Sequence, residues 1–174
     1  MELQEAILLI QTDEFIQGAQ STWADLGCGS GLFTQALASM LYTESTVYAI
    51  DKNISSFKLK SVPNKVVVKA VEADFVNDNL NLKSLDGILM ANALHFVRDK
   101  KSLIEKVSPY FRERPFFLIV EYDTDKPNPW VPYPVSLLSI KKLFTGLGYG
   151  SIKKLHETKS LYHTGNLYSA LITR

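Results

Sequence analysis

The sequence predicts an α/β fold, with a doubly wound, mostly parallel sheet and helices on both faces. Three observations predict it. Strand-like and helix-like segments alternate along the 174 residues, the links between them are short, and no helix separates the last two strand-like segments. Alternation with short links is typical of a parallel sheet covered on both faces. The final strand pair adds one antiparallel strand, and residues 1–174 form a single domain without a separate substrate domain.

The first half of the chain begins with a short helix, placed within residues 1–18, because apolar residues from Leu3 to Ile10 recur at helical spacing. Segments rich in β-branched and apolar residues predict strands, and an apolar stripe predicts the second helix. The expected strands are 21–26, 46–51 and 65–74, the second helix runs from Leu32 to Leu41, and a short helical segment is expected at 54–61.

The second half repeats this alternation. A strand is expected at 85–91, and Asp99 is placed to cap a helix with Leu103, Ile104, Val107 and Phe111 on its inner face. The run 116–122 is almost continuously apolar, as in a strand buried on both faces. The remaining elements are a helix lined by Leu137, Ile140, Phe144 and Leu147, ended by Gly146, Gly148 and Gly150, and two strands within 151–174 joined by a turn.

Charge, cysteine content and hydropathy limit the classes of function. The chain has 19 Lys and Arg against 18 Asp and Glu, so it lacks the basic excess of most duplex-binding proteins. Its single cysteine allows no internal disulfide, and its apolar runs are too short to span a bilayer. The N-terminus is acidic and does not have the pattern of a signal peptide. We therefore expect a cytoplasmic protein that binds neither DNA nor a membrane.

A glycine-rich loop, Gly27-Cys28-Gly29-Ser30-Gly31, follows the first strand, where doubly wound folds bind ligands. A phosphate-binding P-loop needs a lysine, which this loop lacks, and a dinucleotide fingerprint needs a third glycine where Leu32 stands. Asp25 precedes the loop, and its carboxylate would repel a pyrophosphate but suit an ammonium or sulfonium charge. The loop therefore favours a cationic ligand.

The run Asp25-Leu26-Gly27-Cys28-Gly29-Ser30-Gly31 resembles the first motif of the class I (Rossmann-like) S-adenosylmethionine-dependent methyltransferases. The resemblance extends over almost the whole chain. It implies a seven-stranded Rossmann-like sheet, S-adenosylmethionine as cofactor and S-adenosylhomocysteine as product. It also implies transfer of the sulfonium methyl group by in-line displacement to an O, N or C nucleophile.

The resemblance also implies the residues that bind the cofactor. Asp51 would accept hydrogen bonds from the ribose hydroxyls and Asp74 from the adenine amino group, although either acid taken alone is as easily a helix cap or a solvated strand end. The full set of expected cofactor contacts is Asp25, Gly27, Cys28, Gly29, Gly31, Asp51, Lys52, Asp74, Phe75 and Asn92.

His95, in the loop after the fourth strand, is the candidate general base, because imidazole takes up a proton near neutral pH. Local packing beside Phe96 is the alternative. Methyl transfer from a sulfonium can depend largely on positioning, so a base is needed only if the acceptor must lose its proton early. His156 and His163 are expected to be structural or exposed, and Cys28 to be a small buried apolar residue.

The loop 123–135 contains four prolines and follows the strand at 116–122. Long irregular loops in compact domains are often functional. Tyr122, Asp123, Trp130 and Tyr133 are therefore candidate substrate contacts, although Trp130 and Tyr133 could instead pin the loop to the domain. Glu121, Asp123 and Asp125 also suggest a magnesium site similar to that of catechol-type enzymes. Those enzymes also need a metal-binding Asp after the fourth strand, where Ala91-Asn92 stand, so no metal is expected.

The expected function is a methyltransferase that acts on a small molecule. Motifs that resemble those of adenine, glutamine or cytosine methyltransferases are missing after the fourth strand, where Asn92-Ala93-Leu94-His95 stand. A non-catalytic cofactor-binding regulator and an RNA or protein methyltransferase stay open as alternatives. A homodimer is a further alternative, in which a second subunit would provide the lid over the site.

Overall fold

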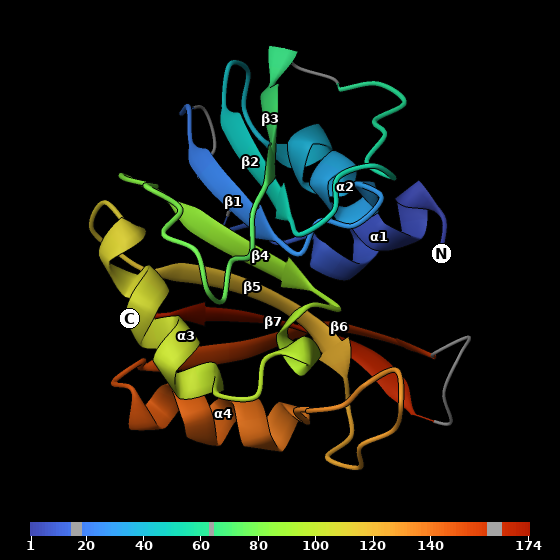
Figure 1. The fold of residues 1–174 in the computed structure, drawn as a ribbon, viewed down its shortest axis with the longest axis vertical. Coiled ribbons are helices and arrows are strands. Elements are labelled where there is room, and N and C mark those ends of the chain that lie inside the picture. Colours follow the sequence, from blue (N-terminus) through green and yellow to red (C-terminus); the bar gives the residue numbers. More distant parts are fainter. Residues whose placement is uncertain (15–18, 63–64, 160–164) are drawn as a thin grey trace.

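The computed structural model describes residues 1–14, 19–62, 65–159 and 165–174. Seven strands form one sheet in the order β3-β2-β1-β4-β5-β7-β6, and Figure 1 shows the helices packed on either side of it. The strands are β1 (Thr22–Leu26), β2 (Thr46–Asp51), β3 (Val67–Glu72), β4 (Gly87–Ala91), β5 (Phe116–Tyr122), β6 (Ser151–Lys159) and β7 (Asn166–Thr173).

The sheet is parallel except where β7 lies antiparallel to both β5 and β6. This confirms the doubly wound sheet with one antiparallel C-terminal strand. β1 and β4 are neighbours in the sheet. The strand order reverses between them, because β2 and β3 lie on one side of β1 and the later strands lie beyond β4. Such a reversal opens a crevice at the carboxyl ends of the strands.

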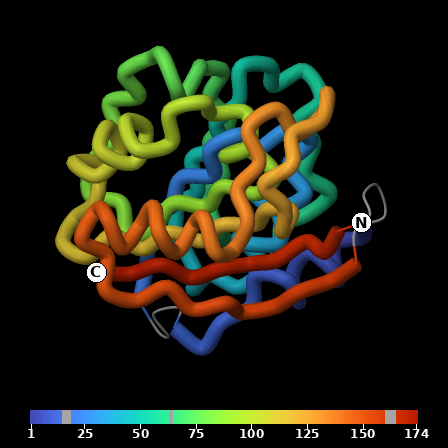
Figure 2. The backbone as a smooth tube through the Cα atoms, turned by 90° about the horizontal axis from the view of Figure 1, so that it is seen from below, coloured from blue at the N-terminus to red at the C-terminus, as the bar shows by residue number. Residues whose placement is uncertain are grey.

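Two hydrophobic clusters hold the layers together. The helices are α1 (Leu3–Ile10), α2 (Leu32–Met40), α3 (Lys100–Val107) and α4 (Leu137–Gly146), with short 3₁₀ turns η2 (Leu94–Phe96) and η3 (Ser108–Tyr110). The buried residues of α1 and α2 belong to one cluster, and those of α3 and α4 to the other. Figure 2 shows α1 and α4 on opposite sides of the C-terminal strand pair, so each cluster fills one face of the sheet.

Most predicted elements are confirmed to within a few residues. β2 and β5 have the predicted bounds, and β5 is buried along its middle on both faces. Asp99 caps α3 as expected, because its Oδ1 accepts from the Ser102 amide at 3.0 Å. Gly148 follows α4 with a φ of +83°, and its amide donates to the Thr145 carbonyl oxygen, as predicted for a glycine that ends a helix.

The first helix is confirmed, because α1 spans the apolar stripe Leu3–Ile10 and Gln11 then turns to an extended conformation. One other prediction about a helix differs from the structure. The segment 54–61 forms turns and extended chain instead of the short helix that we predicted. Its amide at Lys58 donates to the Ser30 carbonyl oxygen at 3.1 Å, and Phe57 and Leu59 pack against Gly31. Contacts with the glycine loop therefore outweigh a weak local helical preference.

None of the helices in the described part of the chain has both the length and the apolar character needed to cross a membrane.

Candidate active site

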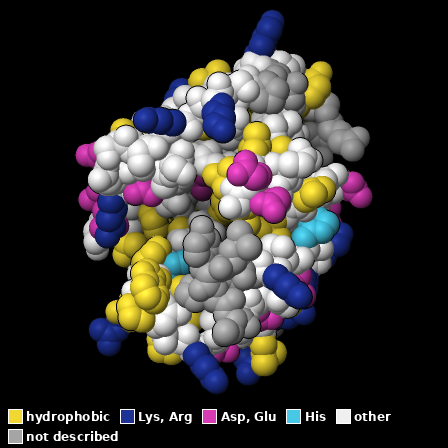
Figure 3. Space-filling model, turned by 90° about the vertical axis from the view of Figure 1, so that its right-hand side faces the viewer, with side chains coloured by type: hydrophobic (Ala, Val, Ile, Leu, Met, Phe, Trp, Pro, Cys, Tyr) yellow, Lys and Arg dark blue, Asp and Glu magenta, His cyan; other side chains and the backbone are white. Residues whose placement is uncertain are grey.

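The candidate site lies at the carboxyl ends of β1, β2, β4 and β5, where the strand order reverses. Figure 3 shows this face of the molecule, which is hollowed and has hydrophobic side chains around the hollow. The glycine loop, the turn after β2 and the turn η2 after β4 all reach this edge. The topology therefore brings together residues that are as far apart in the sequence as Asp25 and Glu121.

The glycine loop folds back onto the end of β2. The amides of Gly27 and Cys28 both donate to the Ile50 carbonyl oxygen, at 2.7 and 3.0 Å, and the Gly29 amide donates to Asp51 Oδ2 at 2.9 Å. Gly27, Gly29 and Gly31 have φ values of +84°, +50° and +92°. Residues with a Cβ rarely adopt such values, so the hydrogen bonds of this loop depend on glycine.

Gly27 and Gly29 differ in what surrounds them, which gives a matched pair of variants. A Cβ at Gly27 would lie 2.5 Å from the Ala93 Cβ, whereas a Cβ at Gly29 meets nothing within 4 Å. Gly27→Ala should therefore lower the free energy of unfolding by about 2 kcal/mol or more. Gly29→Ala should lower the free energy of unfolding by only about 1 kcal/mol, for the positive φ. Its main effect should be weaker binding of a ligand that occupies the open space at this position. Thermal unfolding and calorimetric titration with S-adenosylhomocysteine measure the two effects, and equal destabilisation by both changes would contradict the assignment.

Asp25 is the next-to-last residue of β1, just before this loop, and is almost fully buried. Its Oδ2 accepts from the Thr34 hydroxyl at 2.5 Å, but its Oδ1 has no hydrogen-bond partner among the described residues. Burial raises the pKa of this carboxyl to about 7, against the effect of the Thr34 hydrogen bond, and the nearby Asp51 charge raises it further. A buried acceptor without a donor indicates a missing partner.

Asn92, directly after β4, provides a second such acceptor. Its backbone has a φ of +53°, its amide donates to the Val120 carbonyl oxygen at 2.8 Å, and its Oδ1 is buried without a partner among the described residues. Asparagine tolerates this left-handed conformation better than most residues. The two unpartnered oxygens leave room for a ligand that carries hydrogen-bond donors.

Asp51 ends β2 at the edge of the open space beside Gly29. Its Oδ2 accepts from the Gly29 amide, and its Oδ1 accepts from the Asn53 amide at 3.1 Å. Each carboxylate oxygen has a second lone pair that these bonds do not use. Asp51 therefore both fixes the loop and can still accept hydrogen bonds from a ligand.

Asp74 has the contacts of a loop cap. Its carboxylate accepts from the Val76 amide at 2.9 Å and the Asn77 side chain at 2.6 Å, and Lys52 forms an ion pair with it at 3.0 Å. Desolvation works against ionisation, but the hydrogen bonds from Lys52, Asn77 and the loop amides hold its pKa at about 2. Phe75 is buried beside Gly27. The role of Asp74 toward adenine stays a prediction, and it would require Lys52 to move.

His95 is buried and forms a close pair with Glu121 of β5. His95 Nδ1 lies 2.7 Å from Glu121 Oε2, and the His95 amide donates to Glu121 Oε1 at 3.0 Å. Glu121 is 0% exposed. The sequence reasoning considered Glu121 only as a metal ligand, although a Glu within an otherwise apolar buried strand was a signal that it needs an internal partner.

The candidate substrate residues of loop 123–135 do not gather at one place. Tyr122 lies beside His95, with 5.9 Å between the ring centroids, and the Tyr133 amide donates to the His95 carbonyl oxygen at 3.0 Å. Asp123 accepts from the Leu137 amide at 2.8 Å at the start of α4, and Trp130 is 72% exposed. The geometry therefore favours Tyr122 and Tyr133 as site residues and gives Asp123 a capping role.

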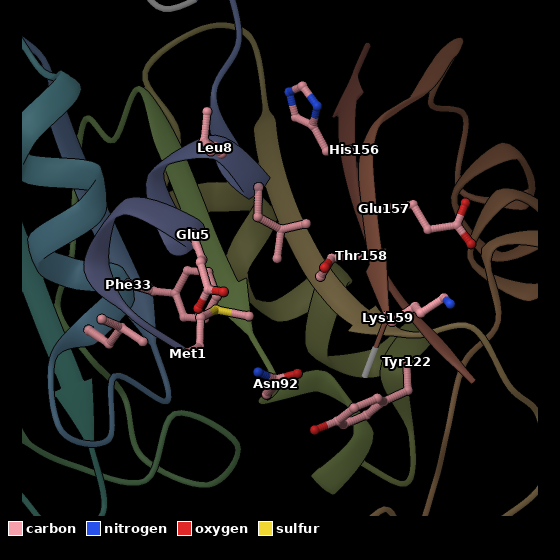
Figure 4. A pocket seen from close by; sticks show the side chains of 12 residues that line it. Met1, Glu5, Leu8, Phe33, Asn92, Tyr122, His156, Glu157, Thr158 and Lys159 are labelled. Atoms are coloured by element: carbon pink, nitrogen blue, oxygen red, sulfur yellow. The ribbon is translucent and has the colours of Figure 1, made fainter. Parts of the chain in front are cut away.

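A cavity of 560 Å³ lies between α1, the start of α2 and β6, with Asn92 and Tyr122 at its base. Leu8, Leu9 and Phe33 provide an apolar wall. Figure 4 shows His156 and Thr158 of β6 pointing toward α1, whereas Glu157 and Lys159 turn away. The sequence reasoning missed this wall, because spacing along the chain does not reveal that α1 and β6 lie side by side.

The remaining sequence candidates have structural surroundings. Cys28 is a free and buried cysteine, and burial, followed by the charges of Asp25 and Asp51, raises the pKa of its thiol to about 12, which agrees with an apolar role. His156 Nε2 lies 3.1 Å from the Gln11 carbonyl oxygen. His163 lies outside the described residues. Within the described ranges, no group of three or more His, Cys, Asp or Glu side chains is placed to hold a metal ion.

Solved structures of several methyltransferases share this fold. The plantazolicin methyltransferase BpumL in complex with SAH has a TM-score of 0.67 at 15% identity over 99% of this chain and 83% of that one. A SAM-dependent methyltransferase from Aquifex aeolicus has a TM-score of 0.62 at 16% identity over 99% and 98% of the two chains. Magnesium protoporphyrin IX methyltransferase (ChlM) from Synechocystis PCC 6803 with bound SAM has a TM-score of 0.66 at 14% identity over 97% and 77%.

A search of curated proteins found no match. The sequence itself matches a family described as "Methyltransferase domain" over residues 24–116, more than half of the chain and the part that carries the glycine loop, Asp51, Asp74 and His95. The chain therefore belongs to this methyltransferase domain family.

Proposed function

We propose that this protein is an S-adenosylmethionine-dependent methyltransferase that transfers a methyl group to a small molecule. The observation that carries the proposal is the pair of buried, unpartnered acceptors, Asp25 Oδ1 and Asn92 Oδ1, beside the glycine loop. An ammonium group has three donors and a positive charge, so the amino acid end of the cofactor fits these two oxygens. A pyrophosphate, which has only acceptors, does not fit them.

The other end of the cofactor fits the turn after β2. The open space at Gly29 allows close approach to the backbone, and Asp51 next to it has lone pairs for the ribose hydroxyls. Bound there, the cofactor supplies an electrophilic methyl group on a sulfonium centre. The chain supplies binding, orientation and exclusion of water.

The acceptor is a small molecule, for which the 560 Å³ cavity between α1 and β6 provides room. Its apolar wall favours an acceptor with an apolar body, and Tyr122, Thr158 and His156 can orient polar groups. The 5.9 Å between the ring centroids of Tyr122 and His95 supports a role for the imidazole, which can take up a proton near neutral pH.

Asp51→Ala should weaken binding of S-adenosylhomocysteine by about 2 kcal/mol, close to 30-fold, because charge-assisted hydrogen bonds to the ribose are lost. Isothermal titration calorimetry measures the affinity. Glu105→Gln on α3 serves as a control and should leave the affinity unchanged, because the exposed Glu105 carboxylate pairs with Lys101 at 3.8 Å. An Asp51 variant with wild-type affinity would show that the ribose lies elsewhere.

Label transfer tests the function as a whole. Purified protein is incubated with methyl-labelled S-adenosylmethionine and a cell extract, which is then separated into small molecules, lipid, RNA and protein. Label in the small-molecule fraction is the expected result. Label in RNA or protein would show that the acceptor is a macromolecule and not a small molecule. Confirmed cofactor binding without any methyl transfer would favour a non-catalytic regulator.

A further inference from the structure

We infer that Glu121 is a positioning residue that makes His95 Nε2 the proton acceptor, and that the methyl acceptor therefore presents a hydroxyl group. The inference rests on the proposed function and adds the identity of the acceptor atom. It starts from the two contacts between these buried residues, at 2.7 and 3.0 Å.

The two contacts fix both the tautomer and the orientation of the imidazole. Glu121 Oε1 accepts from the His95 backbone amide, so the carboxylate is held in one place, and Oε2 then faces Nδ1. A carboxylate has no proton to donate, so Nδ1 must carry the hydrogen. In the neutral ring Nε2 is then the nitrogen with the free lone pair.

The other ring nitrogen is available for chemistry. No hydrogen bond reaches His95 Nε2 from the described residues, whereas Nδ1 is paired. The ring lies between Phe96, at 4.3 Å between centroids, and Tyr122, at 5.9 Å. Tyr122 also lines the 560 Å³ cavity, so the imidazole lies next to a residue of the space that we assign to the acceptor.

Charged and titratable groups surround the pair, and Lys100 brings a positive charge to it. Lys100 at the start of α3 interacts electrostatically with Glu121, and its ammonium donates to the carbonyl oxygens of Val97 and Tyr133 at 2.9 and 2.6 Å. Tyr168 of β7 lies opposite Glu121, but its hydroxyl donates to the Val135 carbonyl oxygen at 3.0 Å. Asp123 and Asp125 face the same tyrosine and accept from the amides of Leu137 and Ser136.

This arrangement suits an acceptor that keeps its proton until the transition state. The hydroxyl O–H bond breaks and its proton passes to Nε2, an oxygen lone pair forms the O–CH₃ bond, and the S–CH₃ bond breaks with its electrons returning to sulfur. The imidazolium that results is paired with Glu121. A carboxylate or thiolate needs no base, and an amine attacks through a free lone pair, so neither class requires this pair.

Nitrogen NMR of protein labelled with ¹⁵N-histidine tests the tautomer without any turnover. The signals of the three histidines are assigned with His156→Gln and His163→Gln. At pH 8 we expect His95 as a single tautomer with Nδ1 protonated and Nε2 unprotonated, and a loss of that single tautomer in Glu121→Gln. A protonated Nε2 in the wild type would overturn the inference, and the proposed function would still stand if label is transferred.

The labelled product and its pH profile give the second test. The expected ether keeps its label in alkali, is not retained by a cation exchanger and releases the label as methyl iodide in hot hydriodic acid. A methyl ester, a methylated amine or a C-methyl group would overturn the hydroxyl assignment. Glu121→Gln should lower kcat at least about tenfold and move the acidic limb of the pH profile to lower pH, because the imidazolium loses its counter-charge. The control Glu105→Gln, at an exposed position, should change neither kcat nor the acidic limb of the pH profile. A lower kcat with an unmoved limb would mean that Glu121 is only structural.

Discussion

Asp25→Asn should make the ligand-free protein more stable and nearly abolish its binding of S-adenosylhomocysteine. In the wild type a buried carboxyl with a pKa of about 7 must ionise near the end of β1, and among the described residues Thr34 alone donates a hydrogen bond to it. Asparagine has the same shape, can still accept from the Thr34 hydroxyl, and carries no charge. The variant thus keeps the packing and removes the desolvation cost.

The sign of the pH dependence follows from the direction of the pKa shift. The folded protein holds the Asp25 proton more tightly than the unfolded chain, whose carboxyl has the ordinary value of 3.8. Between pH 4 and 7 the wild type therefore loses stability relative to the variant as the pH rises, and the difference stays constant above that range. At pH 8 the gain from Asp25→Asn should be about 4 kcal/mol, and it should vanish below about pH 4.

Ligand binding should respond in the opposite direction. The ammonium group of the ligand needs the ionised carboxylate, so the wild-type affinity should rise up to tenfold per pH unit below about pH 7 and level off above it. Loss of a buried charge pair typically costs 2–5 kcal/mol, so the variant should bind about 100-fold more weakly or worse, with a flat pH profile. Thermal unfolding and calorimetric titration at several pH values measure both quantities.

Asp86→Asn is the matched control for this prediction. Asp86 Oδ2 accepts from the Thr22 amide at 2.7 Å, at the opposite end of β1 from the site. The control should lose stability, because it loses a charge-assisted hydrogen bond, and should bind S-adenosylhomocysteine normally. If Asp25→Asn behaved in the same way, the carboxylate of Asp25 would be a structural group and the ammonium would bind elsewhere.

Asp25 and Asp74 show which features of the site could be predicted from the sequence alone. Both acids end or follow a strand at the expected place, so periodicity and the resemblance located them. Only the structure separates one carboxylate with an unpartnered oxygen from another whose oxygens are engaged by Val76, Asn77 and Lys52. Local hydrogen bonding depends on side-chain positions that a strand pattern does not specify.

Long-range contacts were the other part that the sequence did not reveal. The strands and helices followed from apolar spacing, because burial on a regular element repeats with its period. The pairing of Glu121 with His95 spans 26 residues, and the cavity between α1 and β6 joins segments from the two ends of the chain. Such contacts depend on strand order, which a single sequence constrains only through the general rules of topology.

His95→Gln should lower turnover by about 10²- to 10³-fold and leave the affinity for S-adenosylhomocysteine within about threefold of the wild type. Glutamine can still donate to Glu121 through its side-chain amide, so the buried carboxylate keeps a partner and the protein should fold. The amide takes up no proton, so the variant removes the base specifically. His95→Ala should lose turnover as well, but it should also unfold at a lower temperature, because Glu121 is left buried without a side-chain donor.

The control for His95 is the same change at His156, which lines the cavity from β6 and contacts the Gln11 carbonyl oxygen. His156→Gln should raise KM for the acceptor, if it changes anything, and leave kcat near the wild-type value. Steady-state kinetics on the acceptor found by label transfer separate the two parameters. A His95 variant with wild-type kcat would show that His95 is not a general base, and catalysis would then depend on positioning. A loss of kcat confined to His156→Gln would move the chemistry from the end of β4 to the α1–β6 wall of the cavity.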